Sequence, residues 1–355
     1  MDLQDLQKKG YFLKDTGTEH FSLARLSLMN SLKLFFKTSD DIYSNASRII
    51  GGYADMKKEC GLNYAMDACD SLIHLQHFIE LYIKEVLKKL DELLIYDLKN
   101  KPFLYYQTLQ NRANISDNDL ENVHYIEFSE AKNILNELIN KGVIPQQYIY
   151  IKKHIKTIET INQLRNRIAH RGMFILDYDA LDELYGKYVF PFIQELAKND
   201  CEYRDIFQYC VTLNNNDIKP FEDIIKEYQA TSINKRKVYV LKMIGYAAYN
   251  NRIPLDLPPD PPSVINYNSN AYYNQYLQER RDKAAKIVKA YCEDYQYPTK
   301  CPVCNCITLI ETSESDEDAC GNYTCEIECT QCGFKLRGQD FLSKDFNGMG
   351  DLINY

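Results

Sequence analysis

Two groups of residues in this 355-residue sequence have types and spacings that could do chemistry. Arg165 and His170 stand five residues apart in the run Arg165-Asn166-Arg167-Ile168-Ala169-His170, and seven of the twelve cysteines lie between Cys301 and Cys332. Guanidinium groups bind anions, imidazole titrates near neutral pH, and closely spaced thiolates bind metal ions. The sequence therefore indicates one site for an anionic ligand and one for a metal.

The segment from Pro145 to Gly172 predicts a helix with an apolar stripe. Its apolar residues recur at steps of three and four, which is the spacing of one helix face: Ile151, Ile155, Ile158, Ile161, Leu164 and Ile168. Arg165 projects into this stripe, whereas Asn166 and His170 share an adjoining flank. A buried guanidinium needs a carboxylate, a second subunit or an anionic ligand such as phosphate, unless its stem packs and its head reaches water.

The Arg165 to His170 run resembles the Arg-x(4–6)-His motif of the HEPN superfamily, including the polar residue that often follows the arginine. In that family the motif lies late in the third long helix of a four-helix bundle. The run from His77 to Lys84, with Glu80 and Lys84, is similar to the family's first helix. The resemblance covers roughly residues 60–200.

The resemblance implies a mainly α chain with a HEPN-like four-helix bundle and a metal-independent endoribonuclease activity. In such a site, formed by a homodimer or higher homo-oligomer, a ribose 2′-OH attacks the adjacent phosphate and leaves 2′,3′-cyclic phosphate and 5′-OH ends. His170 would act as general base or acid, Arg165 would hold the phosphoryl charge, and Asn166 would orient His170 or contact phosphate. Arg167 and Arg171 would bind substrate phosphates, and Glu80 would be a polar partner from the first helix.

The same resemblance implies a bacterial toxin or an antiphage defence effector that acts on RNA, tRNA included, and is restrained by an inhibitory or trigger protein. Some members of the superfamily only bind nucleotides or proteins, so a non-catalytic binding module with a structural zinc is the alternative. A nucleic-acid-binding regulator built on the cysteine module is a third hypothesis, which the acidity of the chain disfavours.

The cysteine module contains two Cys-x2-Cys pairs, Cys301 with Cys304 and Cys329 with Cys332, separated by 24 residues. This spacing predicts a Zn²⁺ ion held by four thiolates in a zinc-ribbon-like fold, with strands around 306–311, 322–328 and 334–336. Four thiolates leave no open position, so the ion would be structural. Exchange of a ligand with Cys306, Cys320 or Cys325 stays open. The acidic run 311–318 favours a role in protein contact or self-assembly over RNA reading.

Composition bounds these hypotheses. The formal net charge is −8, so RNA contact must be local, as in the basic stretches 152–156, 165–171, 235–237 and 280–283. Each of these stretches could equally be a solvated helix face. The chain has no apolar run of membrane-spanning length and no apolar signal segment near Met1. We therefore expect a cytoplasmic protein without a membrane partner.

Four regions are expected. An N-terminal helical extension takes 1–60, and the HEPN-like bundle takes 61–200. A helical region with a proline-rich connector (253–262) takes 201–295, and the zinc module with a tail takes 296–355. Helices are predicted at 20–37, 63–97, 129–141 with Ser129 as N-cap, 145–172, 179–198, 202–213, 219–229, 236–250 and 271–294.

Overall fold

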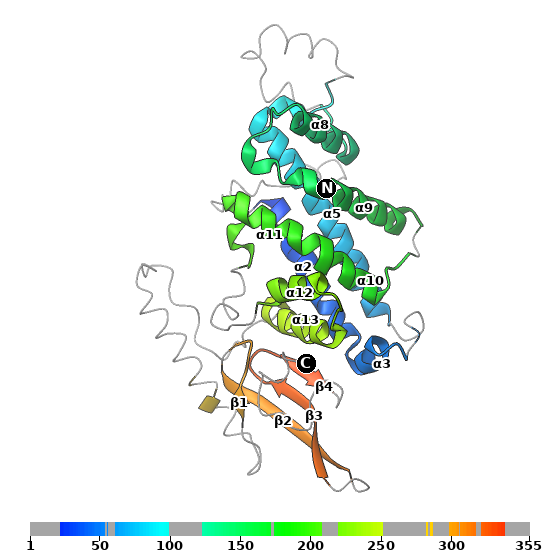
Figure 1. Ribbon diagram of the computed structural model, residues 1–355, viewed down its shortest axis with the longest axis vertical. Coiled ribbons are helices and arrows are strands. Elements are labelled where there is room, and N and C mark those ends of the chain that lie inside the picture. Colours follow the sequence, from blue (N-terminus) through cyan, green and yellow to red (C-terminus); the bar gives the residue numbers. More distant parts are fainter. Residues whose placement is uncertain are drawn as a thin grey trace, which may run out of the picture. The chain divides into compact units, whose positions relative to one another are not determined.

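The chain is mainly helical and carries a small antiparallel sheet near its C-terminal end, as Figure 1 shows. This confirms the prediction of a mainly α chain with a small C-terminal β module. The computed structural model describes residues 22–53, 55, 61–98, 123–171, 174–207, 219–250, 282, 285–286, 298–304, 306–316 and 321–337. The connector 253–262 and most of the expected helix 271–294 lie outside these residues.

The described helices follow the predicted pattern with shifted ends. They are α2 (Leu23–Asp41), α3 (Ala46–Ile50), α5 (Leu62–Leu90), α8 (Phe128–Asn140), α9 (Ile151–Arg171), α10 (Tyr178–Glu183), α11 (Phe190–Asn199), α12 (Pro220–Gln229) and α13 (Lys235–Asn250). Short 3-10 turns are η2 (Tyr43–Asn45), η3 (Glu92–Ile95), η6 (Gln146–Tyr148) and η8 (Cys201–Phe207), and a π-helical segment, η7 (Leu184–Val189), joins α10 to α11. Among the described residues, no helix is long and apolar enough to cross a membrane.

Two predicted helix ends are wrong for local reasons. The long helix stops at Leu90 because Asp91 is extended (φ −163°) and its carboxylate accepts the Leu93 N–H at 2.9 Å, which starts a 3-10 turn. Helix α8 begins at Phe128 after Glu127, so Ser129 lies inside it and is not the N-cap. Phe128 is buried together with Ala131, Leu135 and Ile139, and this packing extends the helix past the expected start.

The first of two compact units comprises the described residues of Met1–Ser31, Leu72–Gly172 and Phe192–Ile206. Its core contains the aromatic rings of Phe78, Tyr82, Phe192 and Tyr203, and the Tyr82 and Tyr150 hydroxyls hydrogen-bond at 2.8 Å. These two buried hydroxyls are therefore paired within an apolar core.

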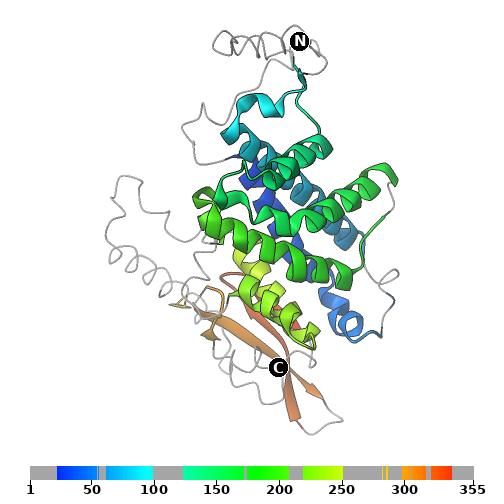
Figure 2. The same cartoon turned by 45° about the horizontal axis from the view of Figure 1, so that its top comes forward.

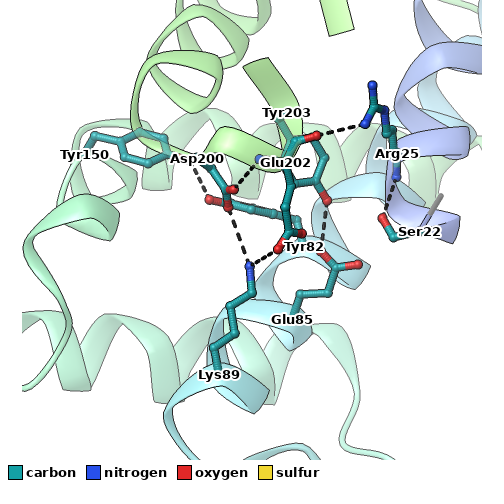
Figure 3. Close-up of polar contacts among 9 residues, drawn as sticks. All are labelled: Ser22, Arg25, Tyr82, Glu85, Lys89, Tyr150, Asp200, Glu202 and Tyr203. Atoms are coloured by element: carbon teal, nitrogen blue, oxygen red, sulfur yellow. Dashed lines mark hydrogen bonds and ion pairs between the residues drawn. The ribbon is translucent and has the colours of Figure 1, made fainter. Parts of the chain in front are cut away.

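A polar network surrounds η8 in this unit (Figure 3). The Tyr203 hydroxyl donates to Glu85 at 2.9 Å, and the Arg25 guanidinium donates to the Glu202 carbonyl at 3.0 Å. Lys89 pairs with the Glu202 carboxylate at 3.1 Å. Burial raises the pKa of Glu85, because loss of water disfavours the ionised carboxylate.

The second unit comprises the described residues of Leu32–Ser71, Met173–Pro191 and Phe207–Tyr355. It contains a fully buried lysine, Lys242, whose ammonium contacts Asp182 at 2.5 Å and Thr38 at 2.9 Å. Burial raises the pKa of Asp182 to about 6 and lowers that of Lys242. The division into four regions expected from the sequence stays a prediction.

Gly245 shows how tightly this second core is packed. A Cβ at Gly245 would lie 2.3 Å from the ring of Phe36, which is itself fully buried. We expect Gly245→Ala to lower the free energy of unfolding by about 1–2 kcal/mol, because overpacking exceeds the gain in helix propensity. Thermal unfolding with Gly61→Ala as control tests this, since nothing lies within 4 Å of a Cβ at Gly61. An unchanged midpoint in Gly245→Ala would contradict the packing argument.

The sheet has strand order β1-β2-β3-β4 and is antiparallel throughout (Figure 2). Its strands are β1 (Thr299–Lys300), β2 (Ile307–Asp316), β3 (Gly321–Cys329) and β4 (Lys335–Arg337). The three predicted strands are present, and β1 is an addition that the sequence did not indicate. In the same unit Lys335 pairs with Asp40 at 2.9 Å, and the Tyr43 hydroxyl donates to Glu326 at 2.8 Å. The sheet is thereby fixed to the end of α2 and the following turn.

Candidate functional site

Helix α9 forms as its apolar periodicity predicts. Ile151, Ile158 and Ile161 are at most 1% exposed, whereas Ile155, Leu164 and Ile168 are half-buried. Burial therefore weakens toward the C-terminal turns, where Arg165 and His170 lie. The predicted helix start at Pro145 is wrong, because Pro145 precedes the 3-10 turn η6 and α9 begins at Ile151.

Arg165 is half-buried, and its guanidinium donates to the Asn166 side-chain oxygen at 3.1 Å. No described carboxylate forms an ion pair with Arg165. Of the partners that the sequence left open, a carboxylate within the described part of this chain is therefore excluded. A second copy, an anionic ligand or water around the guanidinium remains, and the amide of Asn166 holds the guanidinium in place.

His170 lies in the last turn of α9 and is exposed. Five residues turn a helix by about 140°, so its side chain leaves α9 on a different side from Arg165. Within the described parts of the chain, His170 makes no hydrogen bond or ion pair, so its imidazole is free to contact a ligand. Arg167 is also exposed, and the side chain of Arg171 lies outside the described residues.

Glu80 does not contact the Arg165 to His170 run. Its carboxylate accepts hydrogen bonds from Lys84 at 2.7 Å and from Gln76 at 3.2 Å. Burial alone would raise its pKa, but the hydrogen bond and charge of Lys84 more than compensate and lower it. Glu80 is thus an ionised partner of its own helix.

The four cysteines predicted as ligands come together in the sheet module. Cys301, Cys304, Cys329 and Cys332 are buried, and their sulfurs all lie within 4.8 Å of one another. The Cys301 and Cys332 sulfurs are 3.5 Å apart, and those of Cys304 and Cys329 are 3.6 Å apart. Sulfurs about 2.3 Å from a tetrahedral ion lie about 3.8 Å from one another. These distances fit a metal centre such as zinc.

Main-chain N–H groups contact a sulfur in each of the two Cys-x2-Cys pairs. The Val303 N–H donates to the Cys301 sulfur and the Cys332 N–H to the Cys329 sulfur, each at 3.4 Å. Gly333 has φ +66°, a conformation that glycine adopts without strain. Hydrogen bonds from neighbouring thiols, that of Cys301 first, lower the pKa of the Cys304 thiol, so the cluster favours a thiolate.

Thr308 belongs to this centre, although the sequence did not single it out. It is fully buried, and its hydroxyl oxygen lies 3.1 Å from the Cys329 sulfur and 3.9 Å from that of Cys304. A hydroxyl that hydrogen-bonds to a ligating sulfur orients it and stabilises its charge. Only the pairing of strand β2 with β3 reveals this contact.

We expect Thr308→Val to weaken metal binding about 10- to 100-fold, the usual effect of losing such a supporting contact. Competition with a chromophoric chelator measures the affinity, and Thr308→Ser, which keeps the hydroxyl, is the control. Equal affinities in Thr308→Val and the unchanged protein would contradict the role given to this hydroxyl.

The other cysteines of the module stand apart from the four. Cys306 is buried and donates to the Cys304 carbonyl at 3.6 Å. Cys320 and the side chain of Cys325 lie outside the described residues, as do the side chains of the acidic run 311–318.

Comparisons with known proteins show similarity over a short segment of the chain. No family model matches the chain, and no solved structure matches it. Three curated proteins named exoribonuclease 2, from Actinobacillus pleuropneumoniae serotypes 5b (strain L20), 3 (strain JL03) and 7 (strain AP76), are each 28% identical over 83 residues. That stretch is 23% of this chain and 12% of each relative. The similarity thus concerns a short segment of much longer proteins.

Proposed function

We propose that this chain is a metal-independent endoribonuclease of the HEPN type. The observation that carries the proposal is the end of α9, where Asn166 holds the guanidinium of Arg165 and His170 stands exposed without a described partner. The partial similarity to proteins named exoribonuclease 2 supports RNA as the substrate class. The HEPN assignment itself rests on the resemblance of the sequence motif.

The proposed chemistry follows from the two side chains. A ribose 2′-OH loses its proton and attacks the adjacent phosphorus, the bond to the 5′-oxygen breaks, and that oxygen gains a proton. Imidazole can carry either proton, and guanidinium can neutralise the charge on the phosphoryl oxygens. The products are a 2′,3′-cyclic phosphate and a 5′-OH. Arg167 and Arg171 would bind neighbouring phosphates.

A second copy completes the proposed site. Arg165 and His170 leave α9 about 140° apart, so one helix does not direct both at the same phosphate. Two copies of α9 would supply two histidines, one as base and one as acid, beside two arginines. We therefore propose that a homodimer is the active form. An inhibitory or trigger protein, and a role as a toxin or defence effector, remain proposals from the motif resemblance.

We also propose that the four-cysteine centre holds Zn²⁺. Sulfur donors in tetrahedral spacing suit zinc, and a complete set of four thiolates leaves no position for substrate. The residues Cys301, Cys304, Cys329 and Cys332 would hold the ion, which would stabilise a sheet too small to fold alone. Glu80 receives no catalytic role, because its carboxylate is engaged by Lys84 and Gln76.

One observation favours a second candidate, a non-catalytic HEPN module that binds a nucleotide or a protein. In a single chain the Arg165 guanidinium hydrogen-bonds to Asn166, and its side chain does not face His170. Such an arrangement can bind an anion without performing proton transfer. The two candidates differ in whether RNA is broken.

The test is incubation of the purified protein with total RNA and with tRNA in excess EDTA. Metal content is measured before and after, so that loss of the structural ion is not mistaken for a catalytic requirement. Fragmentation of RNA by a chain that keeps its bound metal supports the nuclease. Intact RNA together with measurable RNA or nucleotide binding would instead favour the non-catalytic module.

A further inference from the structure

The solvent face of α9 carries a line of polar residues that ends at His170. Lys152, Lys156, Gln163 and Arg167 are all exposed, and we call these four residues the basic stripe. At about 100° per residue they fall, together with His170, within an arc of about 60° on the helix surface. From Lys152 to His170 the helix rises about 27 Å.

The sequence run 152–156 divides into two parts. Lys153 pairs with Glu195 at 3.0 Å, and His154 is buried 3.4 Å from the same carboxylate and against the ring of Phe192. Burial lowers the pKa of His154, so it adds little charge. Neither Lys152 nor Lys156 forms an ion pair with a described carboxylate.

The acidic residue nearest to the stripe along the helix is already occupied. Glu159 lies at the edge of the arc, and its carboxylate pairs with Lys132 of α8 at 2.7 Å. Lys152 and Lys156 therefore keep their positive charge, although the whole chain has a formal net charge of −8. Two lysines without a described ion pair, on the same exposed helix face as Arg167, indicate an anionic ligand that extends along the helix.

We propose that the basic stripe binds the phosphodiester backbone of single-stranded RNA and leads the scissile phosphate to His170. This proposal rests on the proposed nuclease function. Lysine and arginine neutralise successive phosphates, and the amide of Gln163 contacts sugar or base. A length of about 27 Å is enough for several nucleotides. The stripe has no large apolar residue, which separates it from helices that lie on membranes.

The test measures binding apart from cleavage. Fluorescence anisotropy follows a labelled single-stranded RNA with 2′-O-methyl groups, which cannot be cut by 2′-OH attack, over a series of salt concentrations. For a Lys152→Gln and Lys156→Gln double variant, the slope of log affinity against log salt should fall in magnitude by about 1.4. Affinity at the lowest salt should fall about tenfold or more, with unchanged thermal unfolding.

The matched control is a Lys141→Gln and Lys198→Gln double variant, which removes the same charge from exposed positions outside α9. It should keep the slope of the unchanged protein. Equal slopes in the two double variants, or no binding by the unchanged protein, would overturn the stripe proposal. Stripe-dependent binding without cleavage of ordinary RNA would support the stripe and contradict the nuclease, so the two failures are distinguishable.

Discussion

Replacing Cys304 with serine should release the bound metal ion and unfold the sheet module. The four buried sulfurs lie within 4.8 Å of one another, so loss of one thiolate leaves an incomplete tetrahedron. Structural zinc contributes about 10–16 kcal/mol to the folding of small domains, far more than so small a sheet can supply. The metal content per chain should fall from about one to near zero by mass spectrometry of the eluted ion.

The same variant should lose amide protection in strands β2, β3 and β4, measured by hydrogen exchange. The control is Cys201→Ser, since Cys201 is an exposed free cysteine of η8 and not one of the four clustered cysteines. Cys306→Ser should also keep the ion, because the Cys306 sulfur faces the Cys304 carbonyl and is not one of the four clustered sulfurs. A Cys304→Ser protein that retains stoichiometric metal would show that another thiol completes the centre.

Replacing His170 with alanine should lower the rate of RNA cleavage by about 10²- to 10⁴-fold, the usual contribution of a side chain that transfers a proton. The fold should not change, since His170 is exposed. Cleavage is measured under single-turnover conditions with the unchanged protein beside the variant. Binding of 2′-O-methyl RNA should stay within about twofold, because removal of one exposed side chain costs little binding energy.

The matched control for this prediction is His124→Ala, which removes an exposed histidine outside α9. Full activity in the control and loss in His170→Ala would assign proton transfer to His170. Equal activity in all three proteins would mean that the cleavage site lies elsewhere in the chain.

The sequence pattern predicted the structure correctly where the residues that form it lie close together in the sequence. The apolar spacing of three, four and seven residues, which includes Ile151, Ile158 and Ile161, placed the buried face of α9 correctly. The two Cys-x2-Cys pairs identified the four clustered sulfurs before any strand was known. In both cases the residues concerned lie in one helix or in Cys-x2-Cys pairs. Their spacing in the sequence is therefore enough to predict which side chains lie close together.

Contacts between segments that lie far apart in the sequence could not be predicted from spacing. The buried Lys242 meets Asp182 and Thr38, and Thr38 stands 204 residues away from it. In an isolated helix, Lys242 would be taken for a solvated cation. Likewise, the basic run around His154 gave no sign that Lys153 and His154 turn toward Glu195 while Lys152 and Lys156 do not. Tertiary packing decides these cases.

Helix ends were uncertain for a related reason. Ser129 is a good capping residue by type, but burial of Phe128 starts α8 one residue earlier. The π-helical segment Leu184–Val189 also has no local signature. At Gly186, a Cβ would lie 2.1 Å from the ring of Tyr228, so helix packing there requires the residue to be glycine.

The end groups of the RNA fragments test the nuclease proposal most directly. A 5′-labelled single-stranded RNA is incubated with the purified protein in excess EDTA, and the fragments are analysed by mass spectrometry. Attack by a 2′-OH under the control of Arg165 and His170 predicts internal cuts with 2′,3′-cyclic phosphate and 5′-OH ends. Fragments with 3′-OH and 5′-phosphate ends, or single nucleotides released stepwise from one terminus, would contradict the proposed mechanism.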